Sequence, residues 1–261
     1  MDMRQRSYLI PTVLAFWLVL TFAYMACSAM AGMELVGKYI VTLGQVIFDF
    51  AAFWLLFDIF MQSKKNFKFA PFCFMLALMF LVLSDVFYHG IATMGWFSFA
   101  LSTQYLYYDL PLTGFFIFML LGWSRVVAVN KSEGGSYKLF TALVLLSAIL
   151  LLWMFFHSLT AKVPHLSIVG VYLSAQTILQ ALGIMFALVT MARVAQACLH
   201  FIIAGYLMIT VSDIVINARI ESGLVSASGP ELVWMLGSML IAVGAYMRVK
   251  ELAAMKAKSA A

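Results

Sequence analysis

Long apolar stretches alternate along the chain with short segments that hold most of its charged residues. A helix that crosses a bilayer needs about 20 predominantly apolar residues, and the chain of 261 residues offers eight such stretches. They cover residues 8–30, 37–61, 69–87, 105–126, 139–159, 166–191, 201–216 and 232–247. The pattern predicts an all-α integral membrane protein, with eight transmembrane helices in a single membrane domain over residues 1–261.

The composition excludes a soluble domain. Hydrophobic residues make up 65% of the chain and charged residues only 10%, and the mean hydropathy is +1.02. These values leave too little polar surface for a water-soluble fold. Residues 251–261 are rich in alanine and lysine instead, and we expect them to form a short basic tail in the cytoplasm.

The basic residues indicate the topology. When the eight stretches are threaded through a membrane, only Lys38, Lys162 and Arg219 fall on the side opposite the termini. Lysine and arginine concentrate on the cytoplasmic side, so we expect a multi-pass protein of a bacterial inner membrane with both termini in the cytoplasm. The net charge of +5 therefore reports topology, and the expected partners are membrane lipids, not nucleic acid.

Short motifs recur at corresponding places in the two halves. Ser84-Asp85 closes the third apolar stretch and Ser212-Asp213 closes the seventh. Val36-Gly37-Lys38-Tyr39 matches Val169-Gly170-Val171-Tyr172. Asp109 is followed by Gly122, and Glu231 by Gly244, in both cases 13 residues later. They predict two parallel four-helix repeats, about 8–128 and 138–250, with a site at their interface. The alternative is that these residue types recur because they suit helix packing and membrane interfaces.

Asp85 and Asp213 are the leading candidates for function. A carboxylate inside a membrane span is costly and usually persists for a functional reason. Two at corresponding places in a repeat suggest one site with two acids, although each could instead hydrogen-bond helices together.

Other polar residues within the apolar stretches leave the prediction open. Gln176 and Gln180 lie one helical turn apart and could line a cavity or pair across helices. We expect a structural role for Asp58, which approaches two lysines, and the role of Asp49 stays undecided. No His-x-x-x-His pair and no paired cysteine spacing is present, so we expect neither a metal nor another cofactor.

Several of these segments resemble the YhhN-type lysoplasmalogenases, eight-span membrane hydrolases. Residues 205–213 (GYLMITVSD) resemble a glycine-rich apolar run of that family that closes in Ser-Asp, and residues 234–244 (WMLGSMLIAVG) its last-span pattern. In the first half, Ser84-Asp85 stands where the family usually has Gly-Asp, and residues 97–108 are similar to its Phe-rich segment. The chain departs from the family at Gln104, Ser238 and Lys38-Tyr39, where histidine, glutamine and Lys-Pro are common.

The resemblance implies that the chain cleaves the vinyl ether bond of a lysophospholipid, lysoplasmenylethanolamine or lysoplasmenylcholine, to a fatty aldehyde and a glycerophospho head group. This reaction needs an acid to protonate the alkene and a base to activate water. Asp85 and Asp213 are the expected pair, in either order. Candidate substrate contacts are Lys38, Tyr39, Gln104, Tyr108, Asp109, Tyr172 and Glu231.

Two other function classes remain open. A small-molecule or ion-coupled transporter would also carry repeats and intramembrane acids, and it usually interrupts paired helices with glycine or proline. Pro111 in the fourth stretch has no partner in the eighth, which disfavours transport. A lipid-sensing membrane domain is the third possibility. The oligomeric state does not follow from the sequence.

Overall fold

The computed structural model describes residues 3–30, 32–63, 68–92, 101–129, 168–221 and 228–260. Within these ranges the chain forms seven helices and no strand. They are α1 (Met3–Ala29), α2 (Glu34–Gln62), α3 (Phe69–Ala92), α4 (Leu101–Val129), α6 (Ile168–Arg193), α7 (Ala197–Glu221) and α8 (Ser228–Ala260). The all-helical prediction is thereby confirmed for the described residues, whereas the predicted span 139–159 lies outside them.

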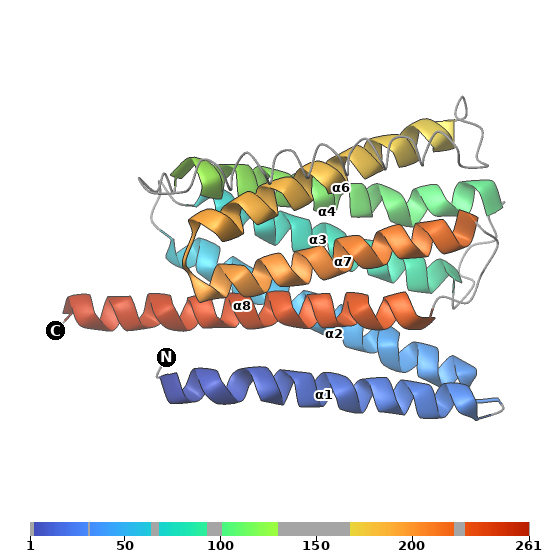
Figure 1. Ribbon diagram of the computed structural model, residues 1–261, viewed down its shortest axis with the longest axis horizontal. Coiled ribbons are helices and arrows are strands. Elements are labelled where there is room, and N and C mark those ends of the chain that lie inside the picture. The colour runs from blue at the N-terminus through green and yellow to red at the C-terminus, as the bar shows by residue number, and fades with distance from the viewer. Residues whose placement is uncertain are drawn as a thin grey trace.

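Four helical segments are long and apolar enough to cross a membrane, which indicates a membrane protein. These are Val36–Gln62, Phe69–Phe87, Ala197–Ile216 and Gly229–Ala257. Shorter apolar segments lie in α1, α4 and α6. The total of eight spans remains a prediction. In its favour, α4 ends at the opposite end of the bundle from the start of α6 (Figure 1).

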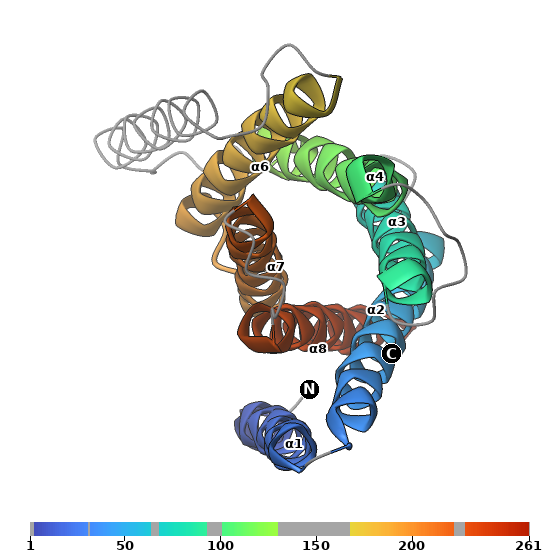
Figure 2. The same ribbon diagram turned by 90° about the vertical axis from the view of Figure 1, so that its right-hand side faces the viewer.

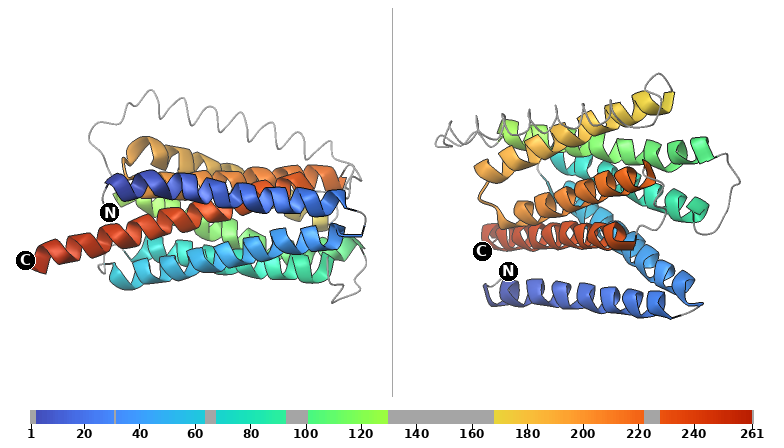
Figure 3. Two further views of the ribbon diagram at one scale, coloured as in Figure 1. Left: turned by 90° about the horizontal axis from the view of Figure 1, so that it is seen from below. Right: turned by 45° about the vertical axis from the view of Figure 1, so that its right-hand side comes forward.

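Six helices form a closed ring in chain order, as Figure 2 shows in a view along the helix axes. Helix α2 packs on α3, α3 on α4, α4 on α6, α6 on α7, α7 on α8, and α8 closes the ring against α2. Helix α1 lies outside the ring against α2 (Figure 3). The ring brings the two predicted repeats together along two seams, α4 with α6 and α8 with α2.

Polar side chains within the helices lie buried among apolar ones, and many of the exposed side chains are apolar. On α2, Ile47 and Trp54 are exposed, whereas Gln45 and Asp49 are buried together with Leu56. Exposing a polar side chain to lipid is energetically costly, so polar residues in membrane spans face the bundle interior. The ring interior is therefore the place to look for a site.

The first turn of α8 is fixed by three other helices. Its carbonyl groups accept side-chain hydrogen bonds from Ser212 Oγ to Pro230 (2.6 Å), Gln45 Nε2 to Glu231 (3.3 Å) and Trp17 Nε1 to Leu232 (3.0 Å). Pro230 is tolerated there because a first-turn residue needs no helical N–H bond. These bonds hold the N-terminal end of α8 against α7, α2 and α1.

Matched glycine contacts favour the predicted duplication. A Cβ atom on Gly122 would lie 2.3 Å from the ring of Phe74, and one on Gly244 would lie 2.7 Å from the side chain of Ile202. Phe74 and Ile202 are separated by the same number of residues as Asp85 and Asp213. Helices α3 and α4 therefore meet at the same positions as α7 and α8.

The predicted tail 251–261 is not a separate segment. Up to Ala260 it continues α8, and Figure 1 shows this end projecting beyond the other helices. Its alanine and lysine residues are strong helix formers, so the helix continues past the apolar part of the span.

Candidate functional site

Asp85 and Asp213 both lie buried in the ring, with 4% and 3% of their surfaces exposed. They occupy corresponding places on α3 and α7, in the half of each helix away from its first turn. The serine that precedes each of them is buried as well. The two Ser-Asp motifs thus place two carboxyl groups inside an apolar bundle.

The nearest acidic neighbour of Asp85 is Asp49 on α2, which is completely buried. The Ser238 side chain of α8 also lies beside Asp49, and the charge of Glu231 acts on Asp85 from the start of α8. Neither oxygen of Asp49 makes a hydrogen bond of good geometry, and neither does Oδ2 of Asp85. Because like charges repel strongly away from water, this pair is best accommodated when one proton is shared between the two groups.

Asp213 has a different environment. The side-chain amide of Gln180 on α6 donates to Oδ2 of Asp213 at 2.5 Å, and that of Gln176 donates to the same oxygen at 3.4 Å. Both glutamines are 2% exposed. Hydrogen bonds that are donated to a carboxylate favour its charged form. The α6 amides therefore suit an ionised Asp213.

The two predicted repeats thus place different chemical groups beside aspartates at matched positions. In the first, α2 supplies a carboxyl group to Asp85. In the second, α6 supplies two amide groups to Asp213. Sequence reasoning left Asp49 undecided and did not assign the glutamines to Asp213. The available signal was their spacing, because residues i and i+4 share one face of a helix.

The predicted substrate contacts are only partly described. Lys38 is exposed and Tyr39 half-buried in the first turns of α2, and Glu231 is half-buried in the first turn of α8. The side chains of Gln104, Tyr108, Asp109 and Tyr172 lie outside the described part of the structure. Helix α4 begins at Leu101, so the backbone of Asp109 lies two turns inside the helix and not at its start.

A layer of buried aromatic side chains joins α3, α4 and α7 inside the ring. Tyr206 lies 5.9 Å from Phe115, 6.4 Å from Phe116 and 6.2 Å from Trp123, and Trp123 lies 4.5 Å from Phe74, between ring centroids. All five rings are buried. Along α7, Tyr206 stands between Ile202 and Asp213, so the aromatic layer lies between Asp213 and the end of the ring where α7 begins.

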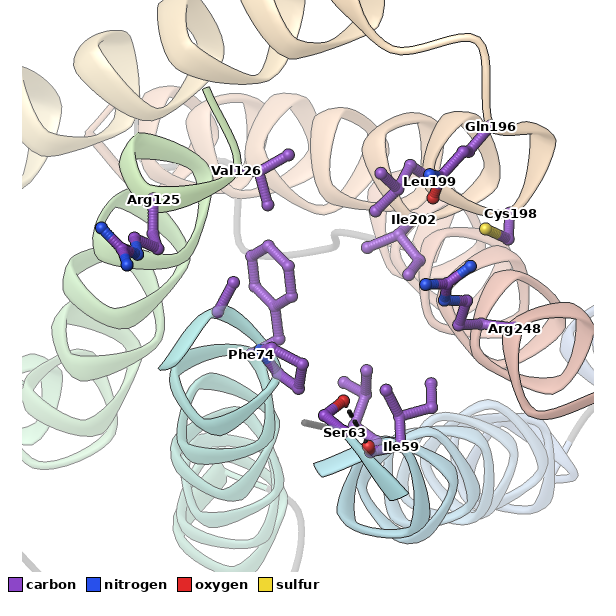
Figure 4. A pocket seen from close by; sticks show the side chains of 13 residues that line it. Ile59, Ser63, Phe74, Arg125, Val126, Gln196, Cys198, Leu199, Ile202 and Arg248 are labelled. Atoms are coloured by element: carbon purple, nitrogen blue, oxygen red, sulfur yellow. Dashed lines mark hydrogen bonds between the residues drawn. The ribbon is translucent and has the colours of Figure 1, made fainter. Parts of the chain in front are cut away.

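That end of the ring holds a cavity of about 220 Å³ (Figure 4). Its walls combine apolar side chains with Ser63, Gln196, Cys198, Arg125 and Arg248. Among the described residues, no group of three or more histidine, cysteine, aspartate or glutamate side chains is placed to hold a metal ion.

Comparison with family models, with curated proteins and with solved structures gave no match to this chain. The resemblance to the lysoplasmalogenases therefore remains a prediction that depends on the residues themselves.

Proposed function

We propose that this chain is an integral membrane hydrolase that cleaves the vinyl ether bond of lysoplasmalogens. The observation that carries the proposal is the contrast between its two matched aspartates. Asp85 lies beside a second carboxyl group, and Asp213 accepts hydrogen bonds from two amides. Acid and base catalysis near neutral pH needs two such groups in different protonation states.

The reaction uses one proton donor and one proton acceptor. The donor protonates the outer alkene carbon, which leaves an oxocarbenium ion at the carbon bonded to oxygen. Water adds to that carbon and gives its proton to the acceptor, forming a hemiacetal. The hemiacetal hydroxyl then returns a proton to the donor, while the acceptor protonates the departing glycerol oxygen. The carbon–oxygen bond breaks, the aldehyde is released, and both groups regain their initial states.

From the two environments we infer the roles that the sequence leaves open. The Asp49 and Asp85 pair holds the proton, and Asp85 delivers it. Asp213, held as a carboxylate by Gln176 and Gln180, orients and deprotonates water. In this scheme Asp49 positions and loads the donor and is not itself in contact with the substrate.

We expect the two ends of the substrate to lie in different surroundings. Its alkenyl chain would lie among apolar side chains, and its glycerophosphate head would reach the end where α2 and α8 begin. Lys38 is exposed there and can pair with a phosphate. Lysoplasmenylethanolamine and lysoplasmenylcholine both meet these requirements.

The aromatic layer favours hydrolysis over transport. A carrier must open a route from its binding site to either side of the membrane. Here buried rings from α3, α4 and α7 lie between Asp213 and the end of the ring where α7 begins. A hydrolase needs access from one side only.

The test is aldehyde release from lysoplasmenylethanolamine by the full-length protein in detergent micelles. We expect Asp85→Asn and Asp213→Asn each to lower kcat by about 100-fold or more, because general acid or base catalysis contributes about 10²–10⁴. The matched control is Asp58→Asn, which makes the same change on α2 at a half-buried position and should retain activity.

Folding must be checked in the same preparations, by monodispersity and thermal melting. A monodisperse wild-type protein that releases no aldehyde would overturn the assignment as a hydrolase. Loss of activity in only one aspartate variant would retain the hydrolase and remove the two-aspartate mechanism.

A further inference from the structure

The cavity at the far end of the ring is built from matched residues of the two halves. Ala70, Pro71 and Phe74 of α3 line one side, and Cys198, Leu199 and Ile202 of α7 line the other. Each of the three pairs has the spacing that relates Asp85 to Asp213. The cavity therefore lies between the two predicted repeats, as the acids do, but at the other end of the ring.

This cavity combines one arginine at its rim with an apolar interior. Arg248 of α8 extends its guanidinium group toward the cavity, whereas the guanidinium of Arg125 on α4 points away from it on the other side (Figure 4). The first turns of α3 and α7 both contribute to the lining, and a helix carries partial positive charge at its N-terminal end. Phe74, Ile202, Leu56 and Ile59 supply apolar surface farther in.

Arg248 keeps donors free for a ligand. Its Nη1 donates to Oε2 of Glu251 at 3.2 Å, and the same oxygen accepts a weak bond from Cys198 Sγ at 3.6 Å. A guanidinium has five N–H donors in a fork that matches phosphate. A bound anion would have to compete with the Glu251 carboxylate for Arg248.

We propose that this cavity binds a phosphate group, either the head of a single-chain amphiphile whose tail follows the apolar wall or free phosphate. The volume of about 220 Å³ accommodates a phosphate and the first part of a chain. This site is distinct from the aspartate site, and the proposal does not rest on the hydrolase assignment.

The experiment measures binding of dodecyl phosphate to the full-length protein in dodecyl maltoside, by native mass spectrometry and by titration of tryptophan fluorescence. Dodecyl maltoside supplies a matched chain with a neutral head. We expect Arg248→Met to weaken binding about tenfold or more, because a hydrogen bond to a charged group is lost. Glu251→Gln should strengthen binding about threefold, since it removes the competing anion.

The matched control is Lys250→Met. It removes one positive charge from α8 two residues after Arg248, and the Lys250 side chain lies over the ring of Tyr246. Equal weakening in Arg248→Met and Lys250→Met would mean general surface attraction and would overturn the site. Competition by inorganic phosphate would identify free phosphate as the ligand source, and its absence would identify the amphiphile. Asp85→Asn and Asp213→Asn should bind dodecyl phosphate as the wild type does, whatever their hydrolase activity.

Discussion

Asp49 is completely buried, and both of its oxygen atoms lack a hydrogen-bond partner of good geometry. Leaving a buried polar group unsatisfied costs about 1–3 kcal/mol, and more if it is charged. Asparagine cannot ionise, so Asp49→Asn removes the repulsion between Asp49 and Asp85. We therefore predict that it raises Tm by about 2–4 °C, since about 1 kcal/mol shifts Tm by that amount in a chain of this size. The same change should lower kcat about 10-fold or more with little change in KM, because Asp85 loses the partner that shares its proton.

Two readouts separate this role from a structural one. A purely structural Asp49 would give a variant with lower Tm, and a substrate-binding Asp49 would give a higher KM with kcat unchanged. Asp58→Asn on the same helix should leave Tm, kcat and KM near their wild-type values.

The site was only partly predictable at the residue scale. The Ser-Asp repeat was enough to single out Asp85 and Asp213, because a carboxylate in an apolar stretch is rare. Their partners, Asp49, Gln176 and Gln180, come from other helices. Apolar residues surround these helices on nearly every side, so periodicity does not mark which face turns inward. Only the closed ring establishes which polar residues meet.

At the scale of elements, α7 and α8 are packed backbone against backbone. A Cβ atom on Gly205 would lie 2.4 Å from the carbonyl oxygen of Gly237, and one on Gly237 would lie 2.7 Å from that of Gly205. Small residues allow helices to approach this closely in membranes. Because α7 carries Asp213 and α8 carries Ser238, this contact also fixes the geometry of the site.

We predict that Gly205→Ala lowers the thermal stability of the protein by about 1–3 kcal/mol, the usual cost of overpacking a close contact. Thermal melting in detergent measures the effect. The control is Gly229→Ala in the first turn of α8, where a Cβ atom would meet nothing within 4 Å, and it should melt as the wild type does. Equal melting temperatures for the two variants would show that α7 and α8 can separate without cost.

The elements themselves were more predictable than their contacts. The length of the apolar stretches predicted helices in all the described segments, since a helix satisfies the hydrogen bonds of its own backbone in a membrane. The ends were less accurate. Helix α4 begins at Leu101 and α8 continues to Ala260, because helix propensity extends beyond the apolar stretch at both places.

At the scale of the whole molecule, the ring has two chemically different ends. Asp85 and Asp213 lie toward the C-terminal ends of α3 and α7, and the cavity that we propose binds phosphate is lined by the first turns of the same helices. The end with the cavity also carries Arg125, Arg248, Lys250 and Lys256, whereas Lys38 lies at the other end. Because basic residues concentrate on the cytoplasmic side of membrane proteins, we predict that the cavity lies toward the cytoplasm and the acid site toward the outer face.

This orientation predicts the outcome of reporter fusions in a bacterial host. Green fluorescent protein joined after Ala261 should fluoresce, and alkaline phosphatase at the same place should be inactive, because the phosphatase folds only outside the cytoplasm. Figure 1 shows both chain ends at the end of the ring that holds the basic residues, so a fusion before Met1 should behave identically. Alkaline phosphatase joined after Ala92, at the end of α3, should be active. Active phosphatase at the C-terminus would show that the orientation is the reverse of the predicted one. The aspartate site would then draw its substrate from the cytoplasmic leaflet.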